Sequence, residues 1–183
     1  MKRGNNHVER CSGSQDEAYR SAAQEFGGAI MRLARGYEAD ADLARDLEQD
    51  IHAELWRSFA YFEGQCSLRS WVYRIGHNVA VTHIQSCRRT RPDELVGLDT
   101  IAELPAVDDH GADTEQAQLR HRLMATIHRL KPADRQVMLL YLEELTAEEI
   151  GEVTGLSAGA VSTRIHRLKH LLAETFQTER TMP

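Results

Sequence analysis

Cysteine, proline and long apolar runs are all scarce in this chain of 183 residues. Its three cysteines, Cys11, Cys66 and Cys87, are odd in number and widely separated, which argues against a disulfide framework. No stretch approaches the ~20 apolar residues that a membrane span requires, and the polar segment 1–15 lacks the apolar run of a signal peptide. The sequence therefore predicts a cytoplasmic protein without membrane insertion.

The residue patterns of catalysis and metal binding are also missing. There is no phosphate-binding loop, no histidine pair at zinc-binding helical spacing, and no Cys–His constellation that local structure would bring together. His7 and Cys11 have a spacing that suits a metal within a helix, but two ligands make a weak site. His77 and His83 are expected at the surface or near DNA. We predict no enzyme, no cofactor and no metal.

Charge is negative overall, with a formal net charge of -6, but it is strongly segregated. Acids dominate residues 38–63, whereas residues 64–92 contain no acid and five arginines. Residues 93–116 hold eight acids and no lysine or arginine, and the chain is basic again over residues 164–170. Such alternating blocks indicate separate surfaces for separate partners.

Apolar residues recur at steps of three and four along most of the chain, which predicts an all-α fold. Three such stripes fall within residues 16–91 and can close one small core, behind a disordered tail over residues 1–15. Residues 92–113 combine prolines, glycines and many acids without periodicity, which is typical of a flexible linker. A second small helical domain is expected over residues 114–178.

A helix-turn-helix is predicted over residues 146–172. Thr146 and Glu149 have the spacing of a capping box that starts the first helix. Gly151 provides a small residue where the two helices cross, Gly155 suits a left-handed turn, and Val161 can fix the angle between the helices. This motif is the element of the chain that is expected to contact duplex DNA.

The outward face of the second helix carries the residues suited to DNA. Gly159 and Ala160 are small enough to let the backbone approach the major groove. Thr163 and Arg167 can reach base edges, while cations beside them can hold phosphates. A helical hairpin with a merely solvated basic face is the alternative. The predicted DNA-binding residues here are Ser162, Thr163, Arg164, His166, Arg167 and Lys169.

The order and spacing of these segments resemble a bacterial sigma factor of the extracytoplasmic-function (ECF, group 4) type, in the sigma-70 family. Such factors keep only the second and fourth sigma domains, joined by a flexible linker. The resemblance covers about residues 26–176. Residues 46–56 resemble the segment that holds the clamp helices of core polymerase, residues 62–78 the -10 recognition region, and residues 130–172 the -35-binding domain.

The resemblance implies that the chain binds core RNA polymerase, through its clamp helices and flap, and directs transcription from promoters with -10 and -35 elements. An acidic helix face beside an apolar stripe suits docking on a basic partner surface, although a solvated face is the alternative. The candidates for polymerase binding are Asp46, Gln49, Asp50, Glu54 and Trp56.

The acid-free stretch suits melted DNA, whose bases can be trapped by a loop and whose backbone needs cations. By the resemblance, Asn78 and Thr82 form a pocket for a flipped -10 base together with the loop of residues 64–67. Trp71 is expected in the core, whereas Tyr73 is a candidate for stacking on a base. The -10 candidates are Gly64, Gln65, Ser67, Arg69, Arg74, Asn78, Thr82, Arg88 and Arg89.

The acidic linker has two interpretations. By the resemblance it threads channels of the polymerase that nucleic acid normally fills, where carboxylates imitate phosphates; a passive spacer is the alternative. It could also cover the basic faces of the free protein. An anti-sigma factor is a further partner that the resemblance implies.

Two other classes of protein remain open at this point. One is a helix-turn-helix regulator that binds an operator without acting as a polymerase subunit. The other is a helical adaptor that binds only protein.

Overall fold

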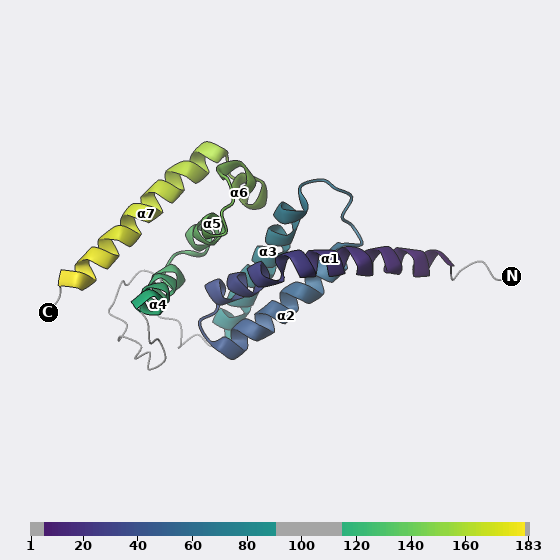
Figure 1. Ribbon diagram of the computed structural model, residues 1–183, viewed down its shortest axis with the longest axis horizontal. Helices are drawn as coiled ribbons and strands as arrows, with labels where there is room; N and C mark the ends of the chain where they lie inside the picture. Colours follow the sequence, from purple (N-terminus) through teal and green to yellow (C-terminus); the bar gives the residue numbers. More distant parts are fainter. Residues whose placement is uncertain (1–5, 91–114, 182–183) are drawn as a thin grey trace.

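The computed structural model describes residues 6–90 and 115–181, with side chains described over residues 15–86 and 118–174. Helices are the only regular secondary structure in the described parts, as predicted, and they form two groups (Figure 1). The linker predicted over residues 92–113 lies outside the described residues. The helices are α1 (Asn6–Tyr37), α2 (Ala41–Ser58), α3 (Leu68–Thr90), α4 (Glu115–His128), α5 (Pro132–Leu142), α6 (Ala147–Thr154) and α7 (Ala158–Thr181).

Helices α1, α2 and α3 form the N-terminal bundle. The carboxylate of Asp40 caps α2 by accepting hydrogen bonds from the amides of Asp42 and Leu43, which would otherwise lack partners. Leu47, Ile51 and Leu55, one turn apart, are fully buried. Four-residue spacing therefore places the apolar face of α2 in the core and leaves its acidic face outside.

The N-terminus of α1 differs from the prediction. The helix begins at Asn6, so helical structure extends into residues 1–15, for which the sequence predicts a disordered tail. No proline interrupts this segment, so the helical hydrogen bonds of α1 can continue backward from residue 16. None of the described helices is both long and apolar enough to cross a membrane.

Helices α4 to α7 form the C-terminal group, and α6 and α7 make the predicted helix-turn-helix. Both hydrogen bonds of the capping box between Thr146 and Glu149 are present. Gly155 ends α6 with a positive φ of 76°, which a glycine adopts without steric cost. A Cβ on Gly151 would lie 2.7 Å from the carbonyl oxygen of Leu156, so only glycine fits at this helix crossing.

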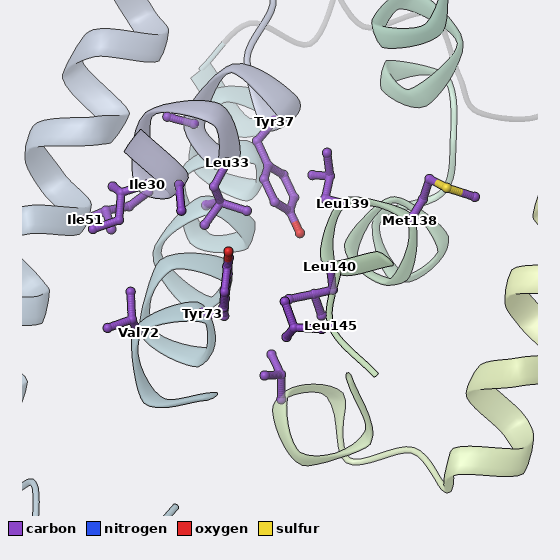
Figure 2. Close-up of a cluster of buried hydrophobic side chains, with 14 of the residues drawn as sticks. Ile30, Leu33, Tyr37, Ile51, Val72, Tyr73, Met138, Leu139, Leu140 and Leu145 are labelled. Atoms are coloured by element: carbon purple, nitrogen blue, oxygen red, sulfur yellow. The ribbon is translucent and has the colours of Figure 1, made fainter. Parts of the chain in front are cut away.

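The two helical groups share one continuous hydrophobic core, which the sequence does not predict. Figure 2 shows Tyr37 and Tyr73 of the N-terminal bundle beside Leu139, Leu140 and Leu145 of the C-terminal group. Gly36 of the N-terminal bundle lies close to Leu139 of the C-terminal group, since a Cβ on Gly36 would lie 2.5 Å from Cδ2 of Leu139. The described structure is therefore a closed pair of domains.

Candidate nucleic-acid interface

The outer face of α7 holds the six residues predicted to bind the -35 element. Val161 and Leu168 are buried on the inner face, while Arg164 is half-buried at the edge. The other five predicted side chains are exposed: Ser162, Thr163, His166, Arg167 and Lys169.

A shallow, open hollow of about 340 Å³ lies on this face. Its lining is formed by Gly159, Ala160, Thr163, Arg164 and Arg167. Apart from its chain neighbours and the nearby backbone of α7, a Cβ on Gly159 would meet no atom within 4 Å, so the space outside the first turn of α7 is open to a ligand. Donors and small residues therefore surround a space that a base edge can enter.

Acceptors within the C-terminal domain hold the cations of α7. The carboxylate of Asp134, in the first turn of α5, lies 3.4 Å from Nε of Arg164. Nη2 of Arg167 donates to both oxygens of the same carboxylate, at 3.1 and 3.3 Å. Lys169 donates to the hydroxyl of Tyr141 at 2.8 Å. The positive charges of α7 are thus already oriented in the closed protein.

Asn78 and Thr82 lie one turn apart on α3, and both are exposed. The hydroxyl of Thr82 donates to the carbonyl of Asn78 at 2.9 Å, which leaves the hydroxyl oxygen as an acceptor toward solvent. Arg88 and Arg89 continue α3 toward its end, but their side chains lie outside the described ones. The structure thus brings Asn78 and Thr82 together on one accessible face.

The loop before α3 is held by its own side chains. Gly64 has a positive φ of 79°, and the side chain of Gln65 spans the loop. Its amide donates to the carbonyl of Tyr61 at 2.9 Å, and its oxygen accepts from the amide of Glu63 at 3.0 Å. The hydroxyl of Ser67 accepts from the amide of Ser70 at 3.0 Å and so caps the N-terminus of α3.

Arg69 and Arg74, in contrast, point into the C-terminal domain. Arg69 donates to the carbonyl of Glu143 at 2.5 Å, and Arg74 donates to the carbonyl of Glu152 at 2.6 Å. Arg74 lies one turn before Asn78 on α3, but in the closed arrangement the C-terminal domain engages the guanidinium groups of both arginines.

Glu143, which the sequence analysis did not identify, lies at the centre of the domain contact. Its carboxylate accepts two hydrogen bonds of 2.6 Å from Arg32 and one of 3.0 Å from the hydroxyl of Tyr73. Arg32 precedes it by 111 positions, so no local pattern could reveal the pair. A pocket of about 540 Å³ at this contact includes Arg32, Tyr73 and Glu143 in its lining.

Two expectations about α3 are wrong. His77, expected at the surface or near DNA, is 0% exposed, and Nδ1 of its ring lies 2.7 Å from the hydroxyl of Tyr37. Burial lowers the pKa of His77 to about 3. Tyr73, a candidate for stacking on a base, is only 3% exposed. Both side chains lie on the face of α3 that the shared core covers, and that core joins residues far apart in sequence.

The acidic face of α2 presents the residues predicted to bind polymerase. Asp46, Gln49 and Asp50 are exposed, and Glu54 is half-buried beside Arg57, 3.1 Å away. Trp56 is 40% exposed, and its indole donates to the carboxylate of Asp16 on α1 at 2.8 Å. Trp71, which is expected in the core, is partly buried and packs against the hydrophobic core, and its indole donates to the hydroxyl of Ser58 at 3.0 Å.

Family models identify both halves of the chain. Residues 23–90 match sigma-70 region 2, and residues 120–172 match sigma-70 region 4. The chain is 28% identical to the RNA polymerase sigma-H factor of Pseudomonas aeruginosa over 178 residues, which cover 93% of this chain and 92% of that protein. It is 26% identical to the ECF RNA polymerase sigma-E factor of Haemophilus influenzae, over 93% of each chain.

Solved structures share the fold. The structure of CnrH in complex with the cytosolic domain of CnrY is 20% identical, with a TM-score of 0.66 over 93% of this chain and 94% of that one. The sigma factor RpoE of Bartonella quintana, in complex with the anti-sigma factor NepR, is 19% identical, with a TM-score of 0.65 over 87% of this chain and 96% of that one.

These matches define the class of protein as an RNA polymerase sigma factor that combines sigma-70 regions 2 and 4. The chain belongs to the sigma-70 family and directs promoter-specific initiation of transcription. An operator-binding regulator or a protein adaptor would not account for the match to region 2 beside region 4.

Proposed function

We propose that this chain is a group 4, extracytoplasmic-function sigma factor, which acts in the bacterial cytoplasm and uses three separate surfaces. The acidic face of α2 binds core polymerase, α3 with its preceding loop binds the melted -10 element, and the outer face of α7 binds the duplex -35 element. The observation that carries this assignment is the hollow on α7, where small residues, hydroxyls and guanidinium groups face solvent together.

At the -35 element, α7 enters the major groove with its first turn leading. Gly159 and Ala160 permit close approach, Thr163 and Arg167 contact base edges, and the remaining polar side chains of the face position the helix on phosphates. Those positioning residues are Ser162, Arg164, His166 and Lys169.

At the -10 element, the exposed turn of α3 and the loop before it hold a base taken out of the stack. Asn78 offers an amide and Thr82 a hydroxyl, groups that hydrogen-bond the edge of an unpaired base. The loop formed by residues 64–67 closes the other side of the pocket. The phosphates are bound by Arg69, Arg74, Arg88 and Arg89.

The domains separate when both elements are bound. The two elements are centred about 25 base pairs apart, which is roughly 85 Å along duplex DNA. In the closed arrangement, Arg74 of α3 donates to the backbone of α6 at 2.6 Å. The closed form therefore cannot place one domain on each element, and opening also releases Arg69 and Arg74 for phosphates.

The docking surface for the clamp helices of polymerase is Asp46, Gln49, Asp50 and Glu54, with Trp56 at its end. The carboxylates of this face point to solvent, while the opposite face of α2 is anchored in the core. A rigid helix with fixed negative charge is suited to a basic partner surface. The flap of polymerase is assigned to the C-terminal domain.

We also propose an anti-sigma factor as a partner. Two solved neighbours of this fold are described in complexes with the cytosolic domain of CnrY and with the anti-sigma factor NepR. A protein that stabilises the closed arrangement would keep Arg69 and Arg74 on their intramolecular acceptors.

Reconstitution with core RNA polymerase tests the three surfaces separately. We expect Arg167→Ala to abolish dependence on the -35 sequence, and Asn78→Ala to slow promoter melting. Asp50→Lys should weaken assembly with core polymerase. The matched controls are exposed residues of similar chemistry away from these surfaces: Arg129→Ala, Gln24→Ala and Glu17→Lys. Failure of the unmodified chain to direct any start site on a suitable promoter would overturn the proposal.

A further inference from the structure

A carboxylate sits inside the surface that is proposed to bind a polyanion. Asp134 lies in the first turn of α5, its side chain is 17% exposed, and it faces the outer edge of α7. It accepts hydrogen bonds from Nη2 of Arg167 at 3.1 and 3.3 Å, and it lies 3.4 Å from Nε of Arg164. One acid thus contacts two of the cations that line the hollow.

Fold stability gives little reason for this arrangement. The side chain of Arg167 is 66% exposed, and ion pairs of such exposed groups contribute only about 0–1 kcal/mol. For simple attraction to phosphates the carboxylate is unfavourable, because it cancels positive charge where counterion release drives DNA binding. The place of Asp134 in the first turn of α5 and its pair with the half-buried Arg164 stabilise the domain modestly, but neither requires the contact with Arg167.

The geometry of Arg167 indicates what the contact with Asp134 provides. Asp134 engages Nη2 alone, so among the described contacts the second N–H of Nη2 and the N–H groups of Nη1 and Nε remain available to a ligand. A guanidinium held at one end presents its other donors in a fixed plane. The second N–H of Nη2 and the neighbouring N–H of Nη1 are parallel and lie in one plane, and such a pair matches the N7 and O6 acceptors of guanine in the major groove. An unheld arginine would reach phosphates and bases in many orientations.

We propose that Asp134 is a positioning residue for base recognition, acting through Arg167 to select a guanine in the -35 element. This inference rests on the proposed role of α7 in binding that element. Asp134 raises the ratio of affinities for correct and incorrect elements while it lowers affinity for DNA in general. A residue with a purely structural role would change both affinities in the same direction.

The test measures binding of the assembled holoenzyme to duplex promoters. Three DNAs are compared across a salt series: the best -35 element, the same element with each G·C pair replaced in turn, and an unrelated duplex. We expect Asp134→Asn to raise affinity for the unrelated duplex a few-fold, because one negative charge is removed. The ratio between the best and the guanine-substituted element should fall roughly 3- to 10-fold, a part of what one good arginine–guanine pair provides.

Two controls isolate the effect. Glu148→Gln removes an exposed first-turn carboxylate of α6 and should leave the ratio unchanged. In an Arg167→Ala background, Asp134→Asn should have no further effect on the ratio, because positioning requires the arginine. Asp134→Ala repeats the measurement without any side-chain acceptor, and thermal unfolding of each variant checks that the domain is folded.

Three results would overturn the inference. Equal gains in affinity for all duplexes would mean that Asp134 only screens charge. A further loss of the ratio in the Arg167→Ala background would mean that it acts through another residue. If Arg167→Ala itself leaves recognition of the -35 element unchanged, the proposed role of α7 fails as well. A loss for Arg167→Ala without a loss for Asp134→Asn removes only the positioning role.

Discussion

The arginines of α3 and those of α7 belong to two proposed DNA-binding surfaces, but their acceptors come from different parts of the molecule. Arg69 and Arg74 donate to carbonyls of the other domain, whereas Arg164 and Arg167 are held by Asp134 in their own domain. Closure of the domains therefore occupies two of the arginines proposed to bind phosphates of the -10 element, and it leaves the proposed -35 surface accessible. The two surfaces should respond differently to anything that opens the protein.

Among the variants, Gly36→Val is expected to have the largest effect on the difference between the two surfaces, because it opens the domains. A Cβ at this position would lie 2.5 and 2.8 Å from the two methyl carbons of Leu139, across the domain contact. Overpacking of this kind costs about 1–3 kcal/mol in the closed form only, which favours opening by roughly 5- to 150-fold. Small-angle X-ray scattering should show a larger radius of gyration. Gly27→Val, on the same helix with open space around it, is the control; an unchanged scattering curve for Gly36→Val would contradict the prediction.

Glu143→Gln should open the domains less. It removes the ion pair with Arg32 and weakens the bond from Tyr73. Because the side chain of Arg32 is 59% exposed, solvent screening limits the expected loss to about 1 kcal/mol. Amide hydrogen exchange should become faster in α6 and in the first turns of α3.

Glu144→Gln is the matched control for this change, since it removes the same charge from an exposed neighbouring side chain. High salt should reduce the difference between the wild type and the Glu143 variant, because it screens the pair. Equal exchange rates for the two variants would show that Glu143 does not hold the domains together.

Acidic pH should lower the free energy of unfolding through the buried ring of His77 in the N-terminal bundle. Burial lowers its pKa to about 3, whereas the unfolded chain titrates near 6.5, so between these values only the unfolded state binds the proton. The contribution to stability is complete above about pH 6.5 and is lost as the pH falls toward 3. We expect the free energy of unfolding to be about 1 kcal/mol lower at pH 5.5 than at pH 7.

Denaturant unfolding at the two pH values measures this loss, and burial lowers the pKa of His128 in the same direction. His77→Gln should reduce the pH dependence even if it lowers stability at every pH. An NMR titration in which the His77 ring gains its proton near pH 6.5 would refute the burial argument.

The smallest change is expected from Gly159→Ala on the other surface. Its Cβ would enter open space, and alanine favours a helix over glycine, so the protein should gain about 0.5 kcal/mol of stability. The -35 element should nevertheless bind more weakly, because the methyl group occupies the approach of the DNA backbone. Thermal unfolding and promoter binding would be measured together. Gly155→Ala, at a positive φ of 76°, should instead destabilise the domain, and a gain in both stability and affinity for Gly159→Ala would argue against close approach.

The sequence predicted what local periodicity determines. The capping box at Thr146, the left-handed turn at Gly155 and the outward face of α7 all depend on residues within a few turns of one another, and the structure agrees with each. The acidic face of α2 was predictable for the same reason, since Leu47 and Ile51 fix which side of that helix is buried.

Local periodicity could not predict contacts between residues that are far apart in the sequence. Tyr73 was misassigned because its hydroxyl meets Glu143, 70 positions further along the chain. His77 was misassigned because its ring contacts Tyr37 of α1, 40 positions earlier. Glu143 carries no local pattern that distinguishes it from Glu144, yet only Glu143 faces Arg32. Sequence periodicity identifies the buried face of a helix but not the element that covers it.

The continuous core also bears on how the protein unfolds. While the domains are closed, Leu139 and Leu140 of one group pack with Tyr37 and Tyr73 of the other, so loss of either group exposes apolar surface of its neighbour (Figure 2). Unfolding of the free protein should then be a single cooperative transition. Once the domains are held apart on polymerase and promoter, each must be stable by its own core. Release from the promoter therefore also restores the thermodynamic coupling between the two halves of the chain.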